Sequence, residues 1–439
     1  MRKIPSKYRQ WLFQELPALE DEGILSADAR QRLENYYTTQ VETRTHWATV
    51  AFAVLGALLI GGGIILLFAH NWEDLSRPTR AVLSFCPLII GAVLSALAIR
   101  RGGTGLRESA GIFHSLAVGA CIALIGQTYH LPSNTPGFLL VWALLVMPLI
   151  FLLPSTGAYL FYITLICSWS GVAQDEYGQA IGFWLLLIPA LVHVVQLIRQ
   201  QAHDGLLSLW GLMLMLPIAL GIVLERTVPG LWIVAYAFFL SLSGLLGLRL
   251  FPSESGWRNP LLTVGLAGTT VLTYIFTWQD IWHDIGWNHT RYYRGFQEWG
   301  IWCDSILILG LVIAWALTAI KALRRDSLPI IILCSFPLFA LASFVFAAFY
   351  EGELINALLF NVYMLALGLA YLVQGCRNTQ LRLVNYGMAV LGLLLITRFF
   401  DSDFGFLARG IAFILMGSAF LATNLIMARR KHQQEDAHS

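Results

Sequence analysis

The side chains most able to do chemistry lie where long apolar runs end. His70 follows the first such run and His130 follows the third, and imidazole is suited to general base catalysis because it titrates near neutral pH. Arg398 and Arg409 could hold an anionic group such as a phosphate. Together these residues predict one polar binding site, made by His70, Asn71, Trp72, Gln127, Tyr129, His130, Arg398, Asp401 and Arg409.

Long apolar runs must position these residues, because such runs make up most of the chain. The 439 residues are 57% hydrophobic and 12% charged, whereas a soluble domain carries about 25% charged residues. A transmembrane helix needs about 20 apolar residues. Runs of this kind occupy residues 47–69, 81–99, 110–126, 137–153, 157–173, 180–198, 206–224, 230–250, 261–277, 303–320, 328–349, 354–373, 382–400 and 407–428. We therefore predict an all-α polytopic bundle of about fourteen spans, in which the two runs that meet at 153–157 are either separate or a re-entrant pair.

The basic residues predict how these spans are oriented. Cytoplasmic loops of membrane proteins are enriched in Lys and Arg. If the N-terminus is cytoplasmic and the spans alternate, only seven of the 28 Lys and Arg residues lie outside: Arg77, Arg80, Arg226, Arg291, Arg294, Arg398 and Arg409. We therefore predict that both termini are cytoplasmic and that the candidate site faces outward.

The polarity of the chain divides it into three regions. Residues 1–45 are polar and predict a cytoplasmic helical hairpin, in which Ser26 caps the second helix. Residues 46–428 form the membrane bundle, and residues 429–439 form a cytoplasmic tail. The longest outer segment, 278–302, is rich in tryptophan and predicts an interfacial, largely helical lid.

Ionisable residues are rare inside the predicted spans. No Asp or Glu lies in the middle of a span, which argues against proton-driven or sodium-driven transport. His114 is expected to form a hydrogen bond within the bundle, with a functional role as the alternative, and His193 to pack or to reach the cytoplasmic interface. No spacing typical of metal ligands occurs, so we predict neither a metal nor a cofactor. The net charge of +2 gives no indication of a nucleic-acid partner.

Several stretches resemble a family of bacterial predicted membrane proteins. Residues 55–72 (LGALLIGGGIILLFAHNW) resemble the first block of the family that carries the domain of unknown function 2157. Residues 123–130 (ALIGQTYH) are similar to its second block, and Trp142 lies in the span that follows. Residues 385–410 are similar to the end of longer family members.

The resemblance covers residues 5–155 well and residues 380–430 moderately. It implies a location in the bacterial cytoplasmic (inner) membrane, and it implies no particular activity because none is established for the family. The resemblance therefore supports the topology and the choice of site residues.

Three classes of function remain compatible with these patterns. We favour a non-enzymatic envelope component (transport, channel or assembly) whose outer site binds a small solute, a glycan or a lipid-linked molecule, because no known catalytic motif occurs. The first alternative is a membrane-embedded enzyme for a lipid-linked or glycan substrate, with His70 or His130 as the general base and Arg398 or Arg409 holding an anionic group. The second is a scaffold or sensor that binds a protein partner through the N-terminal hairpin. All three share the lipid bilayer as a partner.

Overall fold

The computed structural model describes most of the chain as helices. The described residues are 6–38, 74–199, 204–228, 230–252, 256–283, 298–325, 328–349 and 352–400, with single positions between 407 and 421. No strand occurs in these ranges. The chain divides into two units, Met1–Ser76 and Arg77–Ser439, and each is described by itself.

The first unit contains two helices joined by a tight turn. Helix α1 (Ser6–Asp21) and helix α2 (Ala27–Thr38) are separated by Gly23, whose φ of 72° lies in the left-handed region that favours glycine. The hydroxyl of Ser26 accepts a hydrogen bond of 3.3 Å from the backbone N–H of Ala29, which confirms Ser26 as the cap of α2. The cytoplasmic location of these helices stays a prediction.

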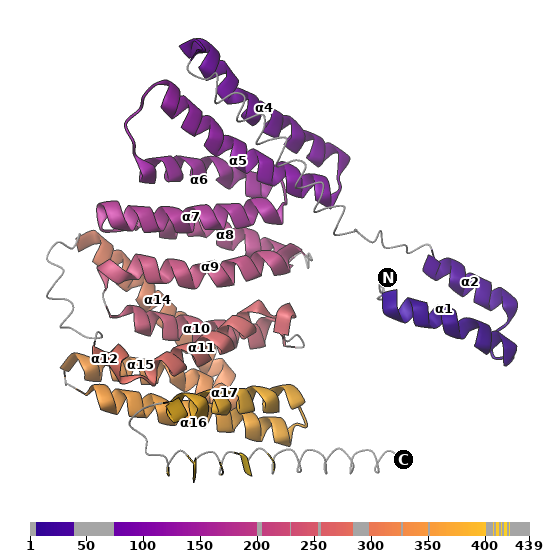
Figure 1. Cartoon of the computed structure of the whole chain (residues 1–439), viewed down its shortest axis with the longest axis vertical. Coiled ribbons are helices and arrows are strands. Elements are labelled where there is room, and N and C mark those ends of the chain that lie inside the picture. The colour runs from indigo at the N-terminus through magenta and orange to yellow at the C-terminus, as the bar shows by residue number, and fades with distance from the viewer. Residues whose placement is uncertain are drawn as a thin grey trace. The chain divides into compact units, whose positions relative to one another are not determined.

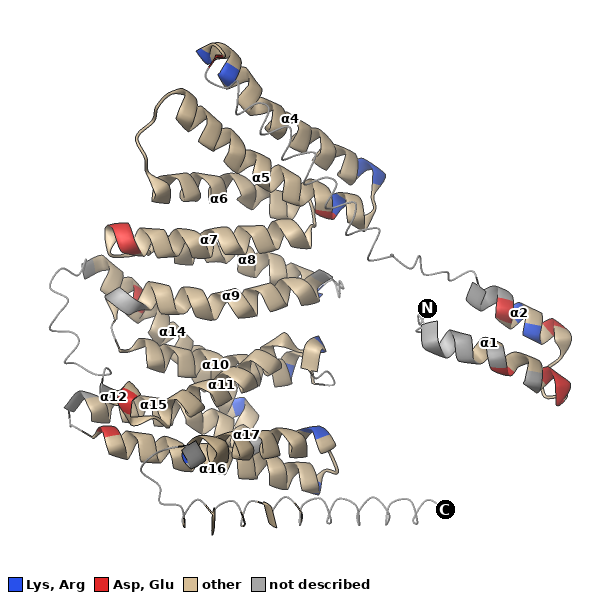
Figure 2. Ribbon diagram, viewed as in Figure 1, with Lys and Arg blue, Asp and Glu red and all other residues tan. Residues whose placement is uncertain are grey.

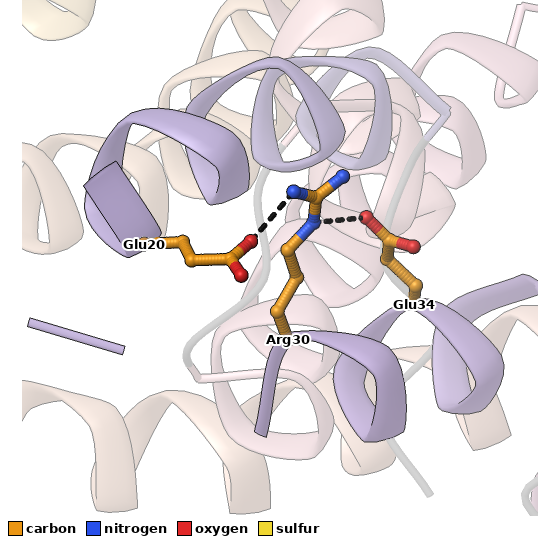
Figure 3. A network of polar contacts seen from close by, with 3 residues as sticks. All are labelled: Glu20, Arg30 and Glu34. Atoms are coloured by element: carbon orange, nitrogen blue, oxygen red, sulfur yellow. Dashed lines mark hydrogen bonds and ion pairs between the residues drawn. The ribbon is translucent and has the colours of Figure 1, made fainter. Parts of the chain in front are cut away.

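Arg30 connects the two helices of this unit through its guanidinium group (Figure 3). Its Nη1 lies 2.7 Å from Glu20 Oε2 on α1, and its Nε lies 2.8 Å from Glu34 Oε1 on α2. Hydrogen bonds to Glu34 and Glu20 hold the pKa of the Arg30 guanidinium above its ordinary value. The Arg30 guanidinium therefore stays charged at any physiological pH.

Twelve helices of the second unit coincide with predicted spans. They are α4 (Arg77–Arg101), α5 (Thr104–Thr128), α6 (Thr135–Leu152), α7 (Thr156–Tyr177), α8 (Gly182–Arg199), α9 (Asp204–Thr227), α10 (Trp232–Leu250), α11 (Pro260–Phe276), α14 (Glu298–Ala322), α15 (Leu328–Phe349), α16 (Glu353–Arg377) and α17 (Leu381–Phe400). Eleven of them are long and apolar enough to cross a membrane, and α11 is apolar but has only 17 residues. The predicted run 47–69 lies outside the described residues, and the run 407–428 is described only at single positions. The chain is therefore a polytopic helical membrane protein, and the count of fourteen spans stays a prediction.

The helices on either side of residues 153–157 are separate. Helix α6 ends at Leu152 and α7 begins at Thr156. The carboxylate of Glu108, which belongs to α5, accepts hydrogen bonds from Ser155 Oγ (2.8 Å), from the N–H of Thr156 (2.8 Å) and from the N–H of Gly157 (2.7 Å). A carboxylate at a helix N-terminus satisfies N–H groups that have no partner within the helix, and it interacts favourably with the helix dipole. Glu108 therefore fixes the start of α7 and the short turn before it.

The helices of the second unit follow one another in space roughly in chain order, except that α14 lies beside α9 and α10 (Figure 1). Figure 1 shows α4, α5 and α6 toward one end of this unit and α16 and α17 toward the other. Helices α7 and α10 are the most enclosed, since 61% and 67% of their apolar stretches are buried, against 22% for α4. The main core therefore surrounds α7 and α10, while α4 presents most of its surface to lipid.

Helices α10 and α11 approach each other at glycine. A Cβ atom on Gly265 of α11 would lie 2.7 Å from Gly244 Cα and 2.8 Å from the carbonyl oxygen of Leu240, both on α10. Asn259, which caps α11 and is fully buried, donates from Nδ2 to the carbonyl of Gly247 at 3.0 Å. Small residues allow two membrane helices to pack backbone to backbone. These contacts make α10 and α11 one tightly packed pair.

The charged residues are unevenly distributed between the two ends of the helices (Figure 2). Figure 2 shows Lys and Arg at both ends of α4 and at the right-hand end of the α16–α17 pair, and Asp and Glu at the left-hand ends of α7 and α16. Arg77 and Arg80 lie at the start of α4 and Arg100 and Arg101 at its end, while Glu353 lies at the start of α16. The orientation of the spans, which rests on the Lys and Arg count in the sequence, stays a prediction.

Reporter fusions should distinguish the two ends of the bundle. We expect reporters fused after Thr135 and Gln179 to report the outer side, and those fused after Gly102 and Thr379 to report the cytoplasm. The last two positions lie in turns next to basic helix ends, where φ is 71° and 53°. Paired alkaline phosphatase and green fluorescent protein fusions would measure this. The same location at Gly102 and Thr135 would contradict the alternation, because α5 and one turn separate them.

Candidate functional site

The structure describes four of the nine residues predicted to form the outer site. His70, Asn71, Trp72, Asp401 and Arg409 lie outside the described residues. Gln127, Tyr129 and His130 lie at the end of α5, and Arg398 lies near the end of α17. Figure 1 shows α5 and α17 toward opposite ends of the second unit, so the described residues lie in two separate places. The four described residues therefore do not converge on one site, and the positions of the other five stay a prediction.

The end of α5 forms an exposed polar corner. The N–H of Tyr129 donates to the carbonyl of Ile125 at 3.0 Å, which closes the helix. His130 follows with a φ of 52°, a left-handed conformation that few residues with a side chain adopt, and it is exposed. The side chain of Tyr129 is also exposed. This corner therefore presents an imidazole and a phenol outside the helix bundle.

Arg398 joins three segments of the chain through its guanidinium group. Its Nε donates to Asn361 Oδ1 on α16 at 3.0 Å, and its Nη2 donates to the carbonyl of Thr277, the residue that caps α11, at 2.5 Å. The guanidinium carbon also lies 5.3 Å from the ring centroid of Trp278, a cation–π arrangement. A cation at a helix C-terminus interacts favourably with the helix dipole. We call Arg398, Asn361, Thr277 and Trp278 the Arg398 centre.

The tryptophans of the predicted lid have different environments. Trp282 belongs to the short helix α12 (Gln279–His283), and it is 2% exposed because its indole stacks on Phe360 and donates to the carbonyl of Phe276 at 2.9 Å. Trp299 and Trp302 at the start of α14 are instead 76% and 66% exposed. Trp282 therefore packs in the protein core, while Trp299 and Trp302 suit an interface with lipid. The lid as a whole stays a prediction, because residues 284–297 lie outside the described part.

A buried carboxylate that the sequence did not single out lies at another helix contact. Asp304 on α14 is 1% exposed, and its Oδ1 accepts from Trp184 Nε1 on α8 at 2.7 Å. Its Oδ2 accepts from Thr227 Oγ1 at the end of α9 at 2.5 Å. Among the described residues, no Lys or Arg forms an ion pair with Asp304. We call Asp304, Trp184 and Thr227 the Asp304 centre.

The signal for Asp304 was present in the sequence. Asp304 lies near the start of the predicted span 303–320 and not in its middle, so the lack of carboxylates in the middle of spans does not apply to it. An Asp five residues after Trp299, where the apolar stretch begins, needs a polar partner inside the bundle. A search of the outer turn of each span would have found it.

The two histidines inside the spans pack within the bundle. His114 Nδ1 lies 3.0 Å from Ser95 Oγ on α4, which confirms the expected hydrogen bond within the bundle. His114 also lines a cavity of about 480 Å³ together with apolar side chains of α4, α5 and α6. His193 is 5% exposed and stacks on Tyr159 with 4.9 Å between the ring centroids, so it is a packing residue.

The comparisons identify the N-terminal third of the chain. A comparison with curated proteins and one with solved structures each found no match. Residues 17–159 match the model of a family described as predicted membrane protein with the domain of unknown function 2157. This match confirms the resemblance over residues 17–155, while the resemblance over residues 5–16 and 380–430 stays a prediction. Over residues 17–159 the chain is therefore similar to the family of predicted membrane proteins that carry the domain of unknown function 2157.

Proposed function

We propose that the protein is a non-enzymatic component of the bacterial cytoplasmic membrane, acting in transport, as a channel or in assembly, with an outward-facing polar binding site at the Arg398 centre. The observation that carries this proposal is the fixed orientation of the guanidinium. Hydrogen bonds to Asn361 and Thr277 and the face of Trp278 hold the group at the end of α17. A guanidinium oriented in this way recognises phosphate or carboxylate with little loss of side-chain entropy.

The chemistry of the neighbouring side chains favours binding over catalysis. Asn361 and Trp278 contact Arg398, and neither an amide nor an indole accepts or releases a proton near neutral pH. The nearby Thr397 hydroxyl donates to Tyr274 Oη at 3.0 Å and so connects α17 to α11. The Arg398 centre thus has groups that orient a ligand.

Aromatic and basic residues at one depth suit the headgroup region of a membrane. The side chain of Trp278 is 37% exposed, and tryptophan is enriched at membrane interfaces. If both termini are cytoplasmic, α17 runs outward and ends at the outer surface. We therefore propose an amphiphile with an anionic headgroup as the ligand class.

Replacing Arg398 should weaken the binding of an anionic amphiphile. For Arg398→Ala we expect at least a tenfold weaker affinity for dihexanoyl phosphatidic acid, since a hydrogen bond to a charged group contributes about 1.5–3 kcal/mol. Arg398→Lys should be intermediate, because lysine keeps the charge and loses the planar fork. Native mass spectrometry or tryptophan fluorescence of the purified protein would measure these affinities.

The opposite end of the same helix offers a matched control. Arg382 is exposed in the first turn of α17, and Arg382→Ala should bind like the wild type. Dihexanoyl phosphatidylcholine, whose headgroup has no net charge, should bind all variants weakly. An Arg398→Ala protein that melts like the wild type and binds phosphatidic acid equally well would overturn the proposal.

A further inference from the structure

An apolar cavity lies between four membrane helices, away from the Arg398 centre. Its volume is about 280 Å³, and its walls come from α8, α9, α10 and α14. Ligand pockets typically measure about 300–1,000 Å³, so this cavity suits one hydrocarbon chain better than a two-chain lipid. The lining side chains carry no charge, and one of them is Trp184 of the Asp304 centre.

Helix α14 connects the cavity to the buried carboxylate. Leu307, Ile308 and Leu311 line the cavity. They follow Asp304 by three, four and seven residues, a spacing that places all four on one face of a helix. Asp304 therefore lies one helical turn beyond the cavity, at the end of the same stripe.

Helices α9 and α8 show the same arrangement. On α9, Leu220 and Leu224 line the cavity, and Thr227 follows Leu224 by three residues. On α8, Trp184 has its ring in the cavity wall and its indole N–H on Asp304, and Leu187 lines the cavity one turn further along. Three apolar stripes thus end at one polar centre.

The Asp304 centre determines which head group fits. A carboxylate offers about four acceptor positions, and the described contacts from Trp184 and Thr227 use two of them. A buried carboxylate without a cation is strongly disfavoured. No described Lys or Arg pairs with Asp304, and a ligand with an ammonium group would place a positive charge beside this carboxylate.

We propose that this cavity binds a single-chain amphiphile with a primary ammonium head, with the chain among the apolar stripes and the ammonium on Asp304. The ligand enters from the side, because the cavity reaches the surface that faces lipid. Leu307 is 36% exposed, and a Cβ atom on Gly310 would meet no atom within 4 Å. A large side chain at Gly310 would therefore occupy the cavity mouth without a clash.

Photolabelling would test both parts of the proposal. The probes are octadecylamine and octadecanoic acid that carry the same diazirine on the chain, added to the purified full-length protein in neutral lipid nanodiscs. We expect the amine to label the peptide that contains Leu307, Ile308 and Leu311 at least fivefold more than the acid does. Gly310→Leu should reduce this labelling at least fivefold, while Gly392→Leu on α17, where a Cβ also meets no atom within 4 Å, should leave it unchanged.

The role of the Asp304 carboxylate in selecting the ammonium head is tested by replacing it with asparagine, which has a similar shape. In Asp304→Asn the preference for the amine over the acid should disappear. If Asp304→Asn fails to fold, two measurements still test the proposal. They are the preference of the wild-type protein for the amine and the comparison of Gly310→Leu with Gly392→Leu. Equal labelling in these two glycine variants, equal labelling by amine and acid in the wild type, or uniform labelling of all helices would each overturn the proposal. Arg398→Ala should leave the labelling unchanged, which separates this site from the proposed outer site.

Discussion

Gly265→Ala should destabilise the fold by at least about 3 kcal/mol or prevent folding. A Cβ atom at this position would lie 2.7 Å from Gly244 Cα and 2.8 Å from the carbonyl oxygen of Leu240. These are backbone atoms of α10, which cannot turn away as a side chain can. Overpacking of a well-packed core typically costs about 1–3 kcal/mol, and more where nothing can relax. Chemical unfolding in detergent, followed by circular dichroism, would measure the loss.

The control for Gly265→Ala is the same substitution in open space. A Cβ atom on Gly392 meets no atom within 4 Å, so Gly392→Ala should leave stability unchanged or raise it slightly, since alanine is the better helix former. Gly247→Ala should resemble Gly265→Ala, because its Cβ would lie 2.8 Å from Leu262 Cα. Equal stability of Gly265→Ala and Gly392→Ala would show that α10 and α11 separate easily.

Glu108→Ala should lower the free energy of unfolding by about 2–4 kcal/mol. The substitution removes the acceptor of two backbone N–H groups at the start of α7 and of the Ser155 hydroxyl. Hydrogen bonds to a charged group contribute about 1.5–3 kcal/mol each but are not additive, and the interaction with the helix dipole is lost as well. Thermal unfolding of the purified variant would show the effect.

Two further variants isolate the role of the Glu108 charge. Glu108→Gln keeps one acceptor oxygen and should lose about half as much stability. Glu176→Ala removes an exposed carboxylate near the other end of α7 and should be neutral. A Glu108→Ala protein as stable as Glu176→Ala would mean that Ser155 alone caps the helix.

The positions of the helices could be predicted from the sequence, because a long apolar run has few alternatives inside a bilayer. The predicted span 230–250 is helix α10 (Trp232–Leu250), and the predicted span 180–198 is helix α8 (Gly182–Arg199). Helix α4 begins at Arg77, four residues before the predicted run. Its first turn contains polar residues that the headgroup region tolerates and that hydropathy does not count.

The contacts between helices could not be predicted in the same way. Asp304 meets Trp184 from 120 residues earlier and Thr227 from 77 residues earlier. Such pairs depend on which helices become neighbours, and apolar runs of similar composition do not encode that choice. The lid predicted over residues 278–302 would place Trp282 at the membrane interface, yet Trp282 is buried and stacks on Phe360 of α16.

The depth of Asp304 makes its charge sensitive to the membrane potential. Asp304 lies five residues after Trp299, where the apolar span of α14 begins, so it is about 7.5 Å deep at 1.5 Å per residue. That is about a quarter of a hydrocarbon layer of about 30 Å. The electrostatic energy of one charge that crosses the whole layer changes by about 2.3 kcal/mol per 100 mV. The energy of a cation that moves from this end of α14 to Asp304 therefore changes by about a quarter of that, about 0.6 kcal/mol per 100 mV. Occupancy of the Asp304 centre by a cation should therefore change between two- and threefold for each 100 mV, in the direction set by the side on which α14 begins.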